Sequence, residues 1–419
     1  MRPVFILSAA RTPIGRFGGA FASMSAADLG EVAARAAIER SGLPPAALDE
    51  TIFGHARQAG GGPNTARQVS HRAGVPDSVP AYTVNKACAS SLKAITLGAL
   101  SIAAGENEAV LVGGTECMSA TPYLMTRARF GYRMGHSEIV DGMYRDGFLC
   151  PLCGQLMGET AENLVREYGI LRAEQDAYAA ESQRRAAEAI ASGRFNDEIA
   201  PVTVGDAARG LIPEGGQIPL RSLIPEGGQI PVRKGPTVVQ KDEHPRPDTT
   251  AESLAKLPPV FEPESGTVHA GNSSGITDAA AALVLASEEE VRGSGVEPLG
   301  RVVAWTSAGV EPERMGIGPV PALRTLLARE KLALSDVDLI ELNEAFAAQV
   351  IACARELPFD LARVNVNGGA IALGHPIGAT GARIATTLLH EMKRRGAERG
   401  VATLCVSGGM GMAVLFERA

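Results

Sequence analysis

The chain has 419 residues, 45% of them hydrophobic, and carries a formal net charge of −7. This length is sufficient for two or three domains with buried cores, and the acidic balance argues against a nucleic-acid-binding protein, which needs a basic face. No apolar run approaches the roughly 20 residues of a membrane span. The first residues read as a strand and a turn rather than a secretory signal, so we expect a cytoplasmic protein.

Strands and amphipathic helices alternate along the first part of the chain. Val4–Ser8 predicts a first strand, and Ala26–Ser41 predicts a helix that ends near Gly42. Ala89–Gly105 predicts a second helix, and the apolar run Glu108–Val112 has the length of a strand. This alternation is typical of an α/β fold with mostly parallel sheets.

Two distant segments share one pattern. The segments "VNKACASSLKAITLGALSIAAGENEAVLVGG" and "VNVNGGAIALGHPIGATGARIATTLLHEMKRRGAERGVATLCVSGG" each begin with Val-Asn at the end of a strand. Each continues through a turn of small residues into a helix, and then into a strand that ends near Gly-Gly. We interpret them as two copies of one α/β unit; turns that merely look alike are the alternative.

The region between them, roughly residues 120 to 275, has a different character. Leu156–Ser192 predicts helix, and a Gly- and Pro-rich stretch follows in which "LIPEGGQIP" occurs at both Leu211–Pro219 and Leu223–Pro231. Two copies are too few for a solenoid, and lengthening a surface loop costs little free energy. We therefore interpret the repeat as a tolerated loop extension, with contact to a partner as the alternative.

Cysteines in a large cytosolic chain are usually reduced. The pair Cys150 and Cys153 forms a C-x-x-C, but neither a second pair nor histidines stand at the spacing of a structural zinc site. We expect no metal. The six cysteines are Cys88, Cys117, Cys150, Cys153, Cys353 and Cys405.

Cys88 stands at the start of a predicted helix, among small residues. Unpaired backbone N–H groups and the helix dipole favour the thiolate there, and the thiolate is the nucleophile. The small neighbours leave room for a substrate. A nucleophile and a buried apolar filler both fit this position.

Three further residues stand in patterns that can carry chemistry. His375 lies in a glycine-rich turn before a helix, where backbone can approach a ligand closely, although the Gly-Lys ending of a phosphate-binding loop is absent. Cys405 precedes glycines whose N–H groups suit an oxyanion hole. Asn343 follows a predicted strand and can orient a water. A structural histidine, a core cysteine and a helix N-cap are the respective alternatives.

Segments along nearly the whole chain resemble motifs of the thiolase family, in the family's order. One such motif could be coincidence, but the full series is specific. The segments are "RTPIGRFGG", "NKACASSLKA", "GGTECMS", "MGETAEN", "GTVHAGNSSGITDAAAA", "MGIGPVPA", "NEAFA", "NGGAIALGHPIGATGAR" and "CVSGGMG".

The resemblance implies the thiolase fold, an α/β architecture. Two duplicated βαβαβαββ halves would form a five-layered αβαβα core with an inserted loop domain. Residues 1–119, continued by about 277–297, would be the N-terminal half, and 298–419 the C-terminal half. Residues 120–276 would form the loop domain that covers CoA.

The resemblance also implies an acyltransferase of the acetyl-CoA C-acetyltransferase or C-acyltransferase type, a class that acts in fatty acid metabolism, including β-oxidation. It couples an acyl-CoA with acetyl-CoA, or cleaves a 3-ketoacyl-CoA with CoA. Cys88 would be the acylated nucleophile, and Cys405 the acid/base, for which a pKa near neutrality is suitable. His375 would activate Cys88 and, with a water held by Asn343, stabilise the enolate oxygen. Backbone N–H groups of Cys88 and Ser407 would form the second oxyanion hole.

CoA is the implied substrate, with no tightly bound cofactor and no metal. Arg246 matches a position that contacts a CoA phosphate, and Ser274 one that contacts pantetheine. The family also generally forms homodimers or homotetramers. Met157, Met315 and Phe346 match positions of the apolar lining near pantetheine and the acyl group. For each of these predicted CoA contacts, ordinary packing or a solvated charge is the alternative.

Two positions depart from the family's pattern. Leu156 stands where thiolases specific for acetoacetyl-CoA typically place His, which weakens the case for strict short-chain specificity. Ser407 replaces a frequent Gly, although a backbone N–H survives that change. Chain length and physiological direction stay open.

Three other classes compete with a catalytic thiolase. A non-catalytic thiolase-like protein could bind acyl-CoA or lipid, but it would be expected to lose Cys405 or the Gly-His-Pro of His375. A decarboxylating ketosynthase need not keep a second cysteine. A papain-like hydrolase orders its residues Cys, His, Asn, whereas here Asn343 precedes His375.

Overall fold

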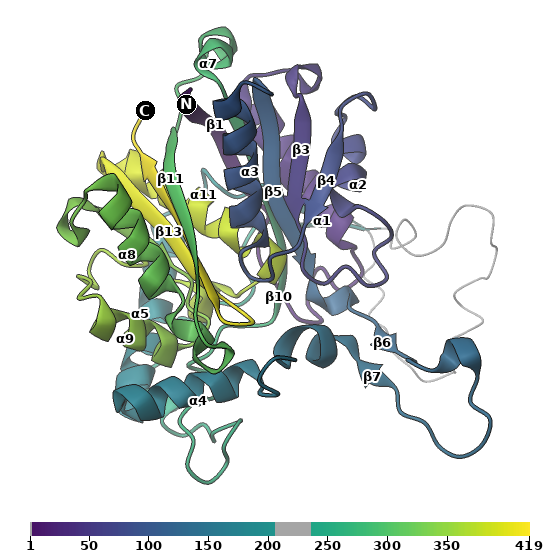
Figure 1. Cartoon of the computed structure of the whole chain (residues 1–419), viewed down its shortest axis with the longest axis vertical. Coiled ribbons are helices and arrows are strands. Elements are labelled where there is room, and N and C mark those ends of the chain that lie inside the picture. Colours follow the sequence, from purple (N-terminus) through teal and green to yellow (C-terminus); the bar gives the residue numbers. More distant parts are fainter. Residues whose placement is uncertain (1, 206–235) are drawn as a thin grey trace.

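A computed structural model of the chain describes residues 2–205 and 236–419 (Figure 1). Both copies of "LIPEGGQIP" lie outside the described residues, so the interpretation of the repeat as a loop extension stays a prediction.

The N-terminal half is built on a five-stranded sheet with the order β4-β3-β5-β10-β1. Strands β4, β3 and β5 are parallel, and β10 is antiparallel to both β5 and β1. Two-residue β2 (Gly15–Arg16) adds to β10. The strands are β1 (Val4–Arg11), β3 (Glu50–Gly54), β4 (Ala81–Val84), β5 (Ala109–Cys117) and β10 (Thr277–Ala286).

Three helices cover this sheet, and the predicted ends of two of them are confirmed. Helix α1 (Ala26–Ser41) starts at a capping box formed by Ser25 and Asp28 and stops at Gly42, whose φ is 72°. Helix α3 (Ser90–Ala104) stops at Gly105, whose φ is 81°. A left-handed residue ends a helix, and glycine adopts that conformation without steric cost. Helix α2 (Thr65–Arg72) packs beside α1.

The C-terminal half repeats the same pattern. Its sheet has the order β12-β13-β14-β11, with β12 and β13 parallel and β14 antiparallel to its two neighbours. The third strand of the unit is reduced to a parallel bridge between Val364 and Ile340. The elements are β11 (Gly300–Gly309), α8 (Pro319–Glu330), β12 (Leu339–Leu342), α9 (Ala347–Glu356), α11 (Thr380–Arg395), β13 (Arg399–Val406) and β14 (Met410–Glu417). Strand order and direction match the first half, so the predicted duplication is confirmed.

The two halves stack into five layers, as expected. Helices α1 and α2 pack on the outer face of the first sheet, and α8 and α9 on the outer face of the second. Helices α3 and α11 contact each other between the sheets (Figure 1), where Leu92, Ile95, Ile384 and Leu388 belong to one buried cluster. The sheets join along three residue pairs between β1 and β11.

The expectation of mostly parallel sheets is wrong, because each sheet is mixed. The first strand of each half runs against its neighbour in the sheet, as does the last. In the second half, β13 returns directly into β14 through the turn at Gly408 and Gly409, and such a short connection permits only antiparallel pairing.

The middle region supplies helices beneath the core and a projecting arm. Strands β6 (Tyr123–Leu124) and β7 (Val140–Asp141) pair at the base of the arm, which stands out from the body (Figure 1). The other helices and strands of this region are α4 (Met157–Tyr168), α5 (Arg172–Ala191), β8 (Val202–Val204), β9 (Thr237–Val239) and α6 (Ala251–Leu254). Two short helices lie outside it, α7 (Glu288–Ser294) and α10 (Ala370–Leu373).

One segment is more apolar than the sequence analysis allowed. Residues Ala87–Ala104 have a mean hydropathy of 1.5 over 18 residues, which is long and apolar enough to cross a membrane by composition alone. The segment comprises α3 and the residues just before it. A helix that is packed between two sheets is apolar on all sides for that reason, so the segment is weak evidence for a membrane span.

Gly381 allows α11 to touch α3. A Cβ at this position would lie 2.3 Å from the backbone nitrogen of Leu92. We predict that Gly381→Ala lowers the free energy of unfolding by about 1–3 kcal/mol, because rigid backbone has to move. The measurement is chemical denaturation, with Gly293→Ala in α7 as the control, since nothing lies within 4 Å of a Cβ there. Equal stability of the two variants would contradict this contact.

Candidate active site

A cavity of about 220 Å³ opens where loops of the two halves meet. Cys88 from the first half lines it together with His375, Cys405 and Ser407 from the second. The structure thus brings together four of the predicted site residues. They are separated by up to some 300 positions in the sequence, and they meet because α3 and α11 lie side by side.

A strained elbow between β4 and α3 presents Cys88. The preceding Ala87 has a φ of 47°, an unfavourable value for a residue with a side chain. The elbow is held by the Ala87 N–H, which donates to the Asn85 side chain at 3.0 Å, and by the Lys86 N–H, which donates to Ser90 Oγ at 2.9 Å. Cys88 is part-exposed, so a substrate can reach its sulfur from the cavity.

Burial raises the pKa of the Cys88 thiol above its ordinary value. The N–H of Ser407 and the charge of Arg57 act in the opposite direction but are the smaller effects. The backbone N–H of Cys88, just before α3, does lower the pKa, the direction expected for a helix terminus. Desolvation outweighs this effect, so the thiol is the favoured form.

His375 lies at the same cavity, and its hydrogen bonds fix the state of its ring. Its Nδ1 lies 2.6 Å from Thr380 Oγ1, whose own hydroxyl donates to the carbonyl of Pro376 at 3.0 Å. The Thr380 oxygen must therefore accept from Nδ1–H, which leaves Nε2 without a proton. Burial lowers the pKa of His375 to about 3, so the imidazole is neutral and its Nε2 can accept.

Cys405 is buried at the penultimate position of β13, where Val406 follows it before the turn to β14. Burial raises the pKa of this thiol well above its ordinary value, and negative charge on Cys88 raises it further. The expectation of a pKa near neutrality is thus wrong for the empty site. In the turn, Gly408 and Gly409 have φ values of 85° and 80°, conformations that aim backbone N–H groups at a ligand at little cost.

Asn343 is fully buried just beyond β12, and it is not among the residues that line the cavity. Its Nδ2 and Oδ1 have no partner in the described part of the chain, whereas buried polar atoms usually have one. The helix N-cap alternative is excluded, because Phe346 caps α9. The loop is fixed by Glu344, whose carboxylate accepts from Tyr178, Ser182 and Asn365.

Four of the five residues expected to contact CoA lie at the cavity. Ser274 lines it, as do Met157, Met315 and Phe346, which form one apolar cluster with Cys405. Arg246 does not line the cavity and is exposed. Its loop nevertheless adjoins the site, because the His244 ring lies so close to Gly275 that a Cβ there would be 2.0 Å from Nε2.

The sequence analysis missed several side chains of the cavity wall, among them Arg57 and Phe148. The guanidinium carbon of Arg57 lies 5.7 Å from the centre of the Phe148 ring. A topological signal for Arg57 existed: it follows β3, and the carboxyl ends of the parallel strands β3, β4 and β5 meet at one edge, where ligands bind. Phe148 belongs to an irregular segment with no such signal.

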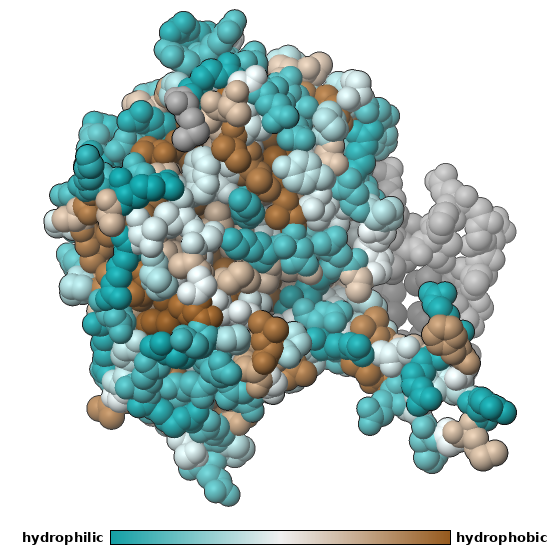
Figure 2. All heavy atoms as spheres, viewed as in Figure 1, coloured by the Kyte–Doolittle hydropathy of each residue, from teal (hydrophilic) through white to brown (hydrophobic). Residues whose placement is uncertain are grey.

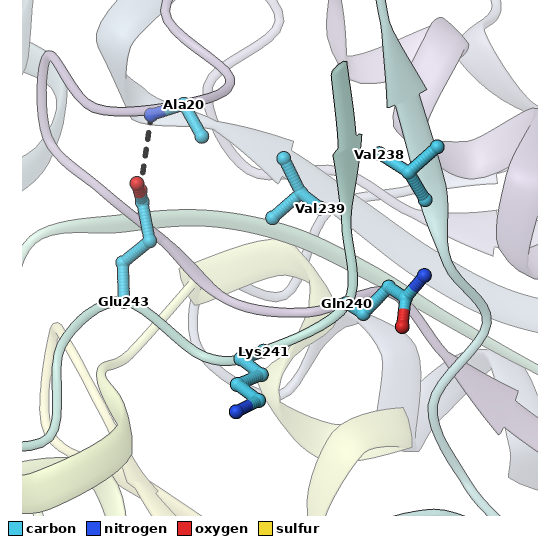
Figure 3. A pocket seen from close by; sticks show the side chains of 6 residues that line it. All are labelled: Ala20, Val238, Val239, Gln240, Lys241 and Glu243. Carbon is cyan, nitrogen blue, oxygen red and sulfur yellow. Dashed lines mark hydrogen bonds between the residues drawn. The ribbon is translucent and has the colours of Figure 1, made fainter.

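A second hollow lies elsewhere and shares no lining residue with the first. It is lined by Ala20, Val238, Val239, Gln240, Lys241 and Glu243 (Figure 3). Glu243 is already engaged there, since it accepts from the N–H of Ala20 at 3.0 Å. Within residues 2–205 and 236–419, no three His, Cys, Asp or Glu side chains group as metal ligands.

Comparison with protein families gives this geometry its context. The model of the thiolase N-terminal domain matches residues 4–212 and 224–289, and that of the thiolase C-terminal domain matches residues 296–418. The chain belongs to the thiolase family. It is a thiolase acyltransferase, and residues 213–223, which the N-terminal match omits, fall within the tandem repeat.

Known thiolases match this one along its whole length. An acetyl-CoA acetyltransferase of Pseudomonas aeruginosa is 48% identical over 419 residues, and one of Escherichia coli is 47% identical over 419, both with full coverage of each chain. The crystal structure of the Bacillus anthracis acetyl-CoA acetyltransferase superposes with a TM-score of 0.92 at 44% identity, covering 100% of this chain and 99% of that one. The human mitochondrial 3-ketoacyl-CoA thiolase in complex with CoA has a TM-score of 0.89 at 40% identity, with 100% and 98% covered.

The neutral state of His375 makes stability depend on pH. Its pKa is about 3 in the folded thiolase and about 6.5 in an unfolded chain. The unfolded state therefore binds the extra proton between these values, and stability falls as the pH drops below about 6.5. We predict a loss of about 2 kcal/mol at pH 5 from this group.

Chemical denaturation at pH 7 and pH 5 measures this loss. His375→Gln should show the smaller drop in unfolding free energy between the two pH values, and replacement of the exposed His136 by Gln should behave as the wild type. An equal drop in wild type and His375→Gln would contradict a buried, neutral His375.

Proposed function

We propose that this thiolase catalyses the reversible cleavage of 3-ketoacyl-CoA by CoA, with the condensation of acyl-CoA and acetyl-CoA as the reverse reaction. Cys88 carries the acyl group and Cys405 transfers protons. The observation that supports these roles is one cavity in which Cys88 meets His375, Cys405 and the backbone of Ser407.

In the first step, His375 Nε2 takes the proton of Cys88, and the sulfur attacks the 3-keto carbon of the substrate. The bond between C2 and C3 then breaks, which leaves an acyl group on Cys88 and the enolate of acetyl-CoA. Protonated His375 and a water held by Asn343 stabilise the enolate oxygen electrostatically. The raised pKa of Cys405 fits a resting thiol that can protonate the enolate carbon.

In the second step, Cys405, now a thiolate, takes the proton from the thiol of an incoming CoA. The CoA sulfur attacks the thioester on Cys88, and the acyl-CoA leaves as the Cys88 thiolate is released. Backbone N–H groups of Cys88 and Ser407 bind the oxygen of the tetrahedral intermediate. Both amides lower the pKa of Cys88, which supports their approach to its sulfur.

We propose that pantetheine lies along the wall made by Ser274, Met157, Met315 and Phe346, and that the exposed Arg246 meets a CoA phosphate. The loop domain 120–276 would cover the nucleotide. Its limits, and those of the halves at 1–119 with 277–297 and at 298–419, are supported by the end of β5 at Cys117 and the start of β10 at Thr277.

The acyl range is proposed to extend beyond acetoacetyl-CoA. Leu156 lines the cavity, and it offers no hydrogen-bonding side-chain atom where thiolases specific for acetoacetyl-CoA typically place His. The relatives are named both acetyl-CoA acetyltransferase and 3-ketoacyl-CoA thiolase. A cytoplasmic setting is proposed as well, and it is supported by six free cysteines, which are usual in reducing compartments.

Cleavage of 3-ketoacyl-CoA substrates of increasing chain length tests the function. We predict that Cys88→Ser and Cys405→Ser each lower kcat by at least about a thousandfold, as expected when a group that acts with others is removed. Mass spectrometry after incubation with acetyl-CoA separates the two roles, because Cys405→Ser should still acylate at Cys88.

Cys153→Ser is the matched control, since Cys153 is part-exposed and does not line the cavity. Full activity in both active-site variants would overturn the two-cysteine mechanism. Wild-type enzyme that cleaves no substrate of the series would revive the non-catalytic alternative, an acyl-CoA- or lipid-binding protein.

The projecting arm supports a homo-oligomer, either dimer or tetramer. Phe130 and Met134 on this arm are 91% and 97% exposed, and the arm stands clear of the body (Figure 2). Clustered exposed apolar side chains mark contact surfaces. We predict that the double variant Phe130→Asp with Met134→Asp lowers the mass measured by light scattering after gel filtration. Arg129→Ser is the control, and an unchanged mass in the double variant would exclude the arm from the interface.

A further inference from the structure

Arg57 is a buried cation to which the reaction described above assigns no role. It follows β3, is only 7% exposed, and lines the cavity. Its Nε and Nη2 have no hydrogen-bond partner in the described part of the chain. Burying a charge without a partner is costly, so a group of this kind indicates a missing anion.

The other fully buried arginines have carboxylate partners. Arg11 bonds both Glu198 and Asp242. Arg383 pairs with Glu341 through Nη1, although its Nε and Nη2 also lack a partner in the described residues. Among the carboxylates of the described residues, the charge of Arg57 helps to lower the pKa of Glu116, and Glu116 is already engaged.

Glu116 has several partners of its own. Its Oε1 lies 3.2 Å from His55 Nε2. It also accepts from three backbone N–H groups, those of Ala56, Arg57 and Gly378. Glu116 thus fixes the backbone at Arg57. The guanidinium of Arg57 lines the cavity and packs against Gly147, where a Cβ would lie 1.9 Å from Nη2.

The position of Arg57 in the cavity identifies which part of a substrate it faces. One apolar cluster contains Cys405 with the proposed pantetheine contacts, Met315 and Phe346. A separate cluster contains Cys88 and Phe148. Arg57 lies over the Phe148 ring, on the side of the cysteine that carries the acyl group.

A CoA phosphate is the less suitable partner for this arginine. The phosphates are proposed to meet the exposed Arg246, outside the cavity lining. An anion that reaches Arg57 has to enter beside Cys88, and the small cavity leaves room there for an acyl chain of a few carbon atoms. The planar guanidinium fork fits a carboxylate through paired hydrogen bonds.

We infer that this thiolase transfers acyl chains that end in a carboxylate, and that Arg57 is the specificity-determining residue that binds this carboxylate. The inference rests on the proposed function, because it assigns the acyl group to Cys88. The substrate class is therefore 3-ketoacyl-CoA with a terminal carboxylate. The ring of Phe148 supports the cation from one face and shields the ion pair from water.

The test compares two substrates of equal chain length, 3-oxohexanoyl-CoA and the same chain with a terminal carboxylate, 3-oxoadipyl-CoA. Wild-type enzyme should have the higher kcat/KM for the carboxylate. In Arg57→Met the ratio of the two kcat/KM values should fall by about 10- to 100-fold, the usual effect of a hydrogen bond to a charged group. Arg57→Lys keeps the charge without the fork and should give an intermediate ratio.

Arg145→Met is the matched control, because Arg145 is exposed on the same segment as Phe148 and does not line the cavity. Its ratio should equal that of the wild type. Equal kcat/KM values of the wild-type enzyme for 3-oxohexanoyl-CoA and 3-oxoadipyl-CoA would overturn this inference and leave the proposed function intact. Cleavage of neither substrate would overturn both.

Two further outcomes separate specificity from other roles of Arg57. An equal loss on both substrates in Arg57→Met would assign Arg57 to the ionisation of Cys88 and overturn the inference. A change confined to the KM of CoA would assign it to a phosphate and overturn the inference as well. Should Arg57→Met fail to fold, the substrate preference of the wild type and the ratio of kcat/KM values in Arg57→Lys still test the inference.

Discussion

The contact between the first turns of α3 and α11 is the constraint on which the site depends. Gly381 brings the backbones of the two helices together, and the N–H of Ala382 donates to Ser91 Oγ at 2.9 Å across the contact. Cys88 stands just before one helix and His375 just before the other. The two loops can approach a common substrate only because the helices that follow them touch, so the buried middle layer is at once the core of the protein and the support of its chemistry.

Burial then decides how that chemistry works. The same apolar surroundings raise the pKa of both cysteines and lower that of His375. These three side chains are therefore neutral at rest, and in the proposed reaction they become charged only when a proton moves between them and the substrate. In the proposed reaction, each charge that forms on these groups would lie near a backbone amide or the imidazole. The arrangement favours proton transfer over a preformed thiolate.

Helix ends and the duplication of the fold could be predicted from the sequence. The features that could not be predicted all depend on contacts between distant segments. The ends of α1 and α3 follow from local signals, namely Gly42 and Gly105, and the duplication follows from a repeated pattern. The direction of the cysteine pKa shifts and the exposed position of Arg246 depend on which distant segments pack around each residue. Mixed sheets depend on how strand ends connect. Local sequence carries turn and capping chemistry, whereas desolvation is a property of the assembled layers.

Arg57 has one feature that the strand pattern predicts and one that depends on the assembled structure. Its place at the carboxyl end of a parallel strand is a topological feature, but its unpaired state becomes visible only when Glu116 is seen to be bound by His55 and three backbone amides. A guanidinium held in this way is costly to bury, because Glu116 interacts with it through charge but no carboxylate of the described chain hydrogen-bonds it. Such a cost persists in a protein when the missing partner arrives with the ligand. The two cysteines have separate apolar walls, and among the described residues that line the cavity the one Arg or Lys is Arg57, at the wall of Cys88. On the inference drawn above, the site would distinguish its two substrates by charge as well as by shape.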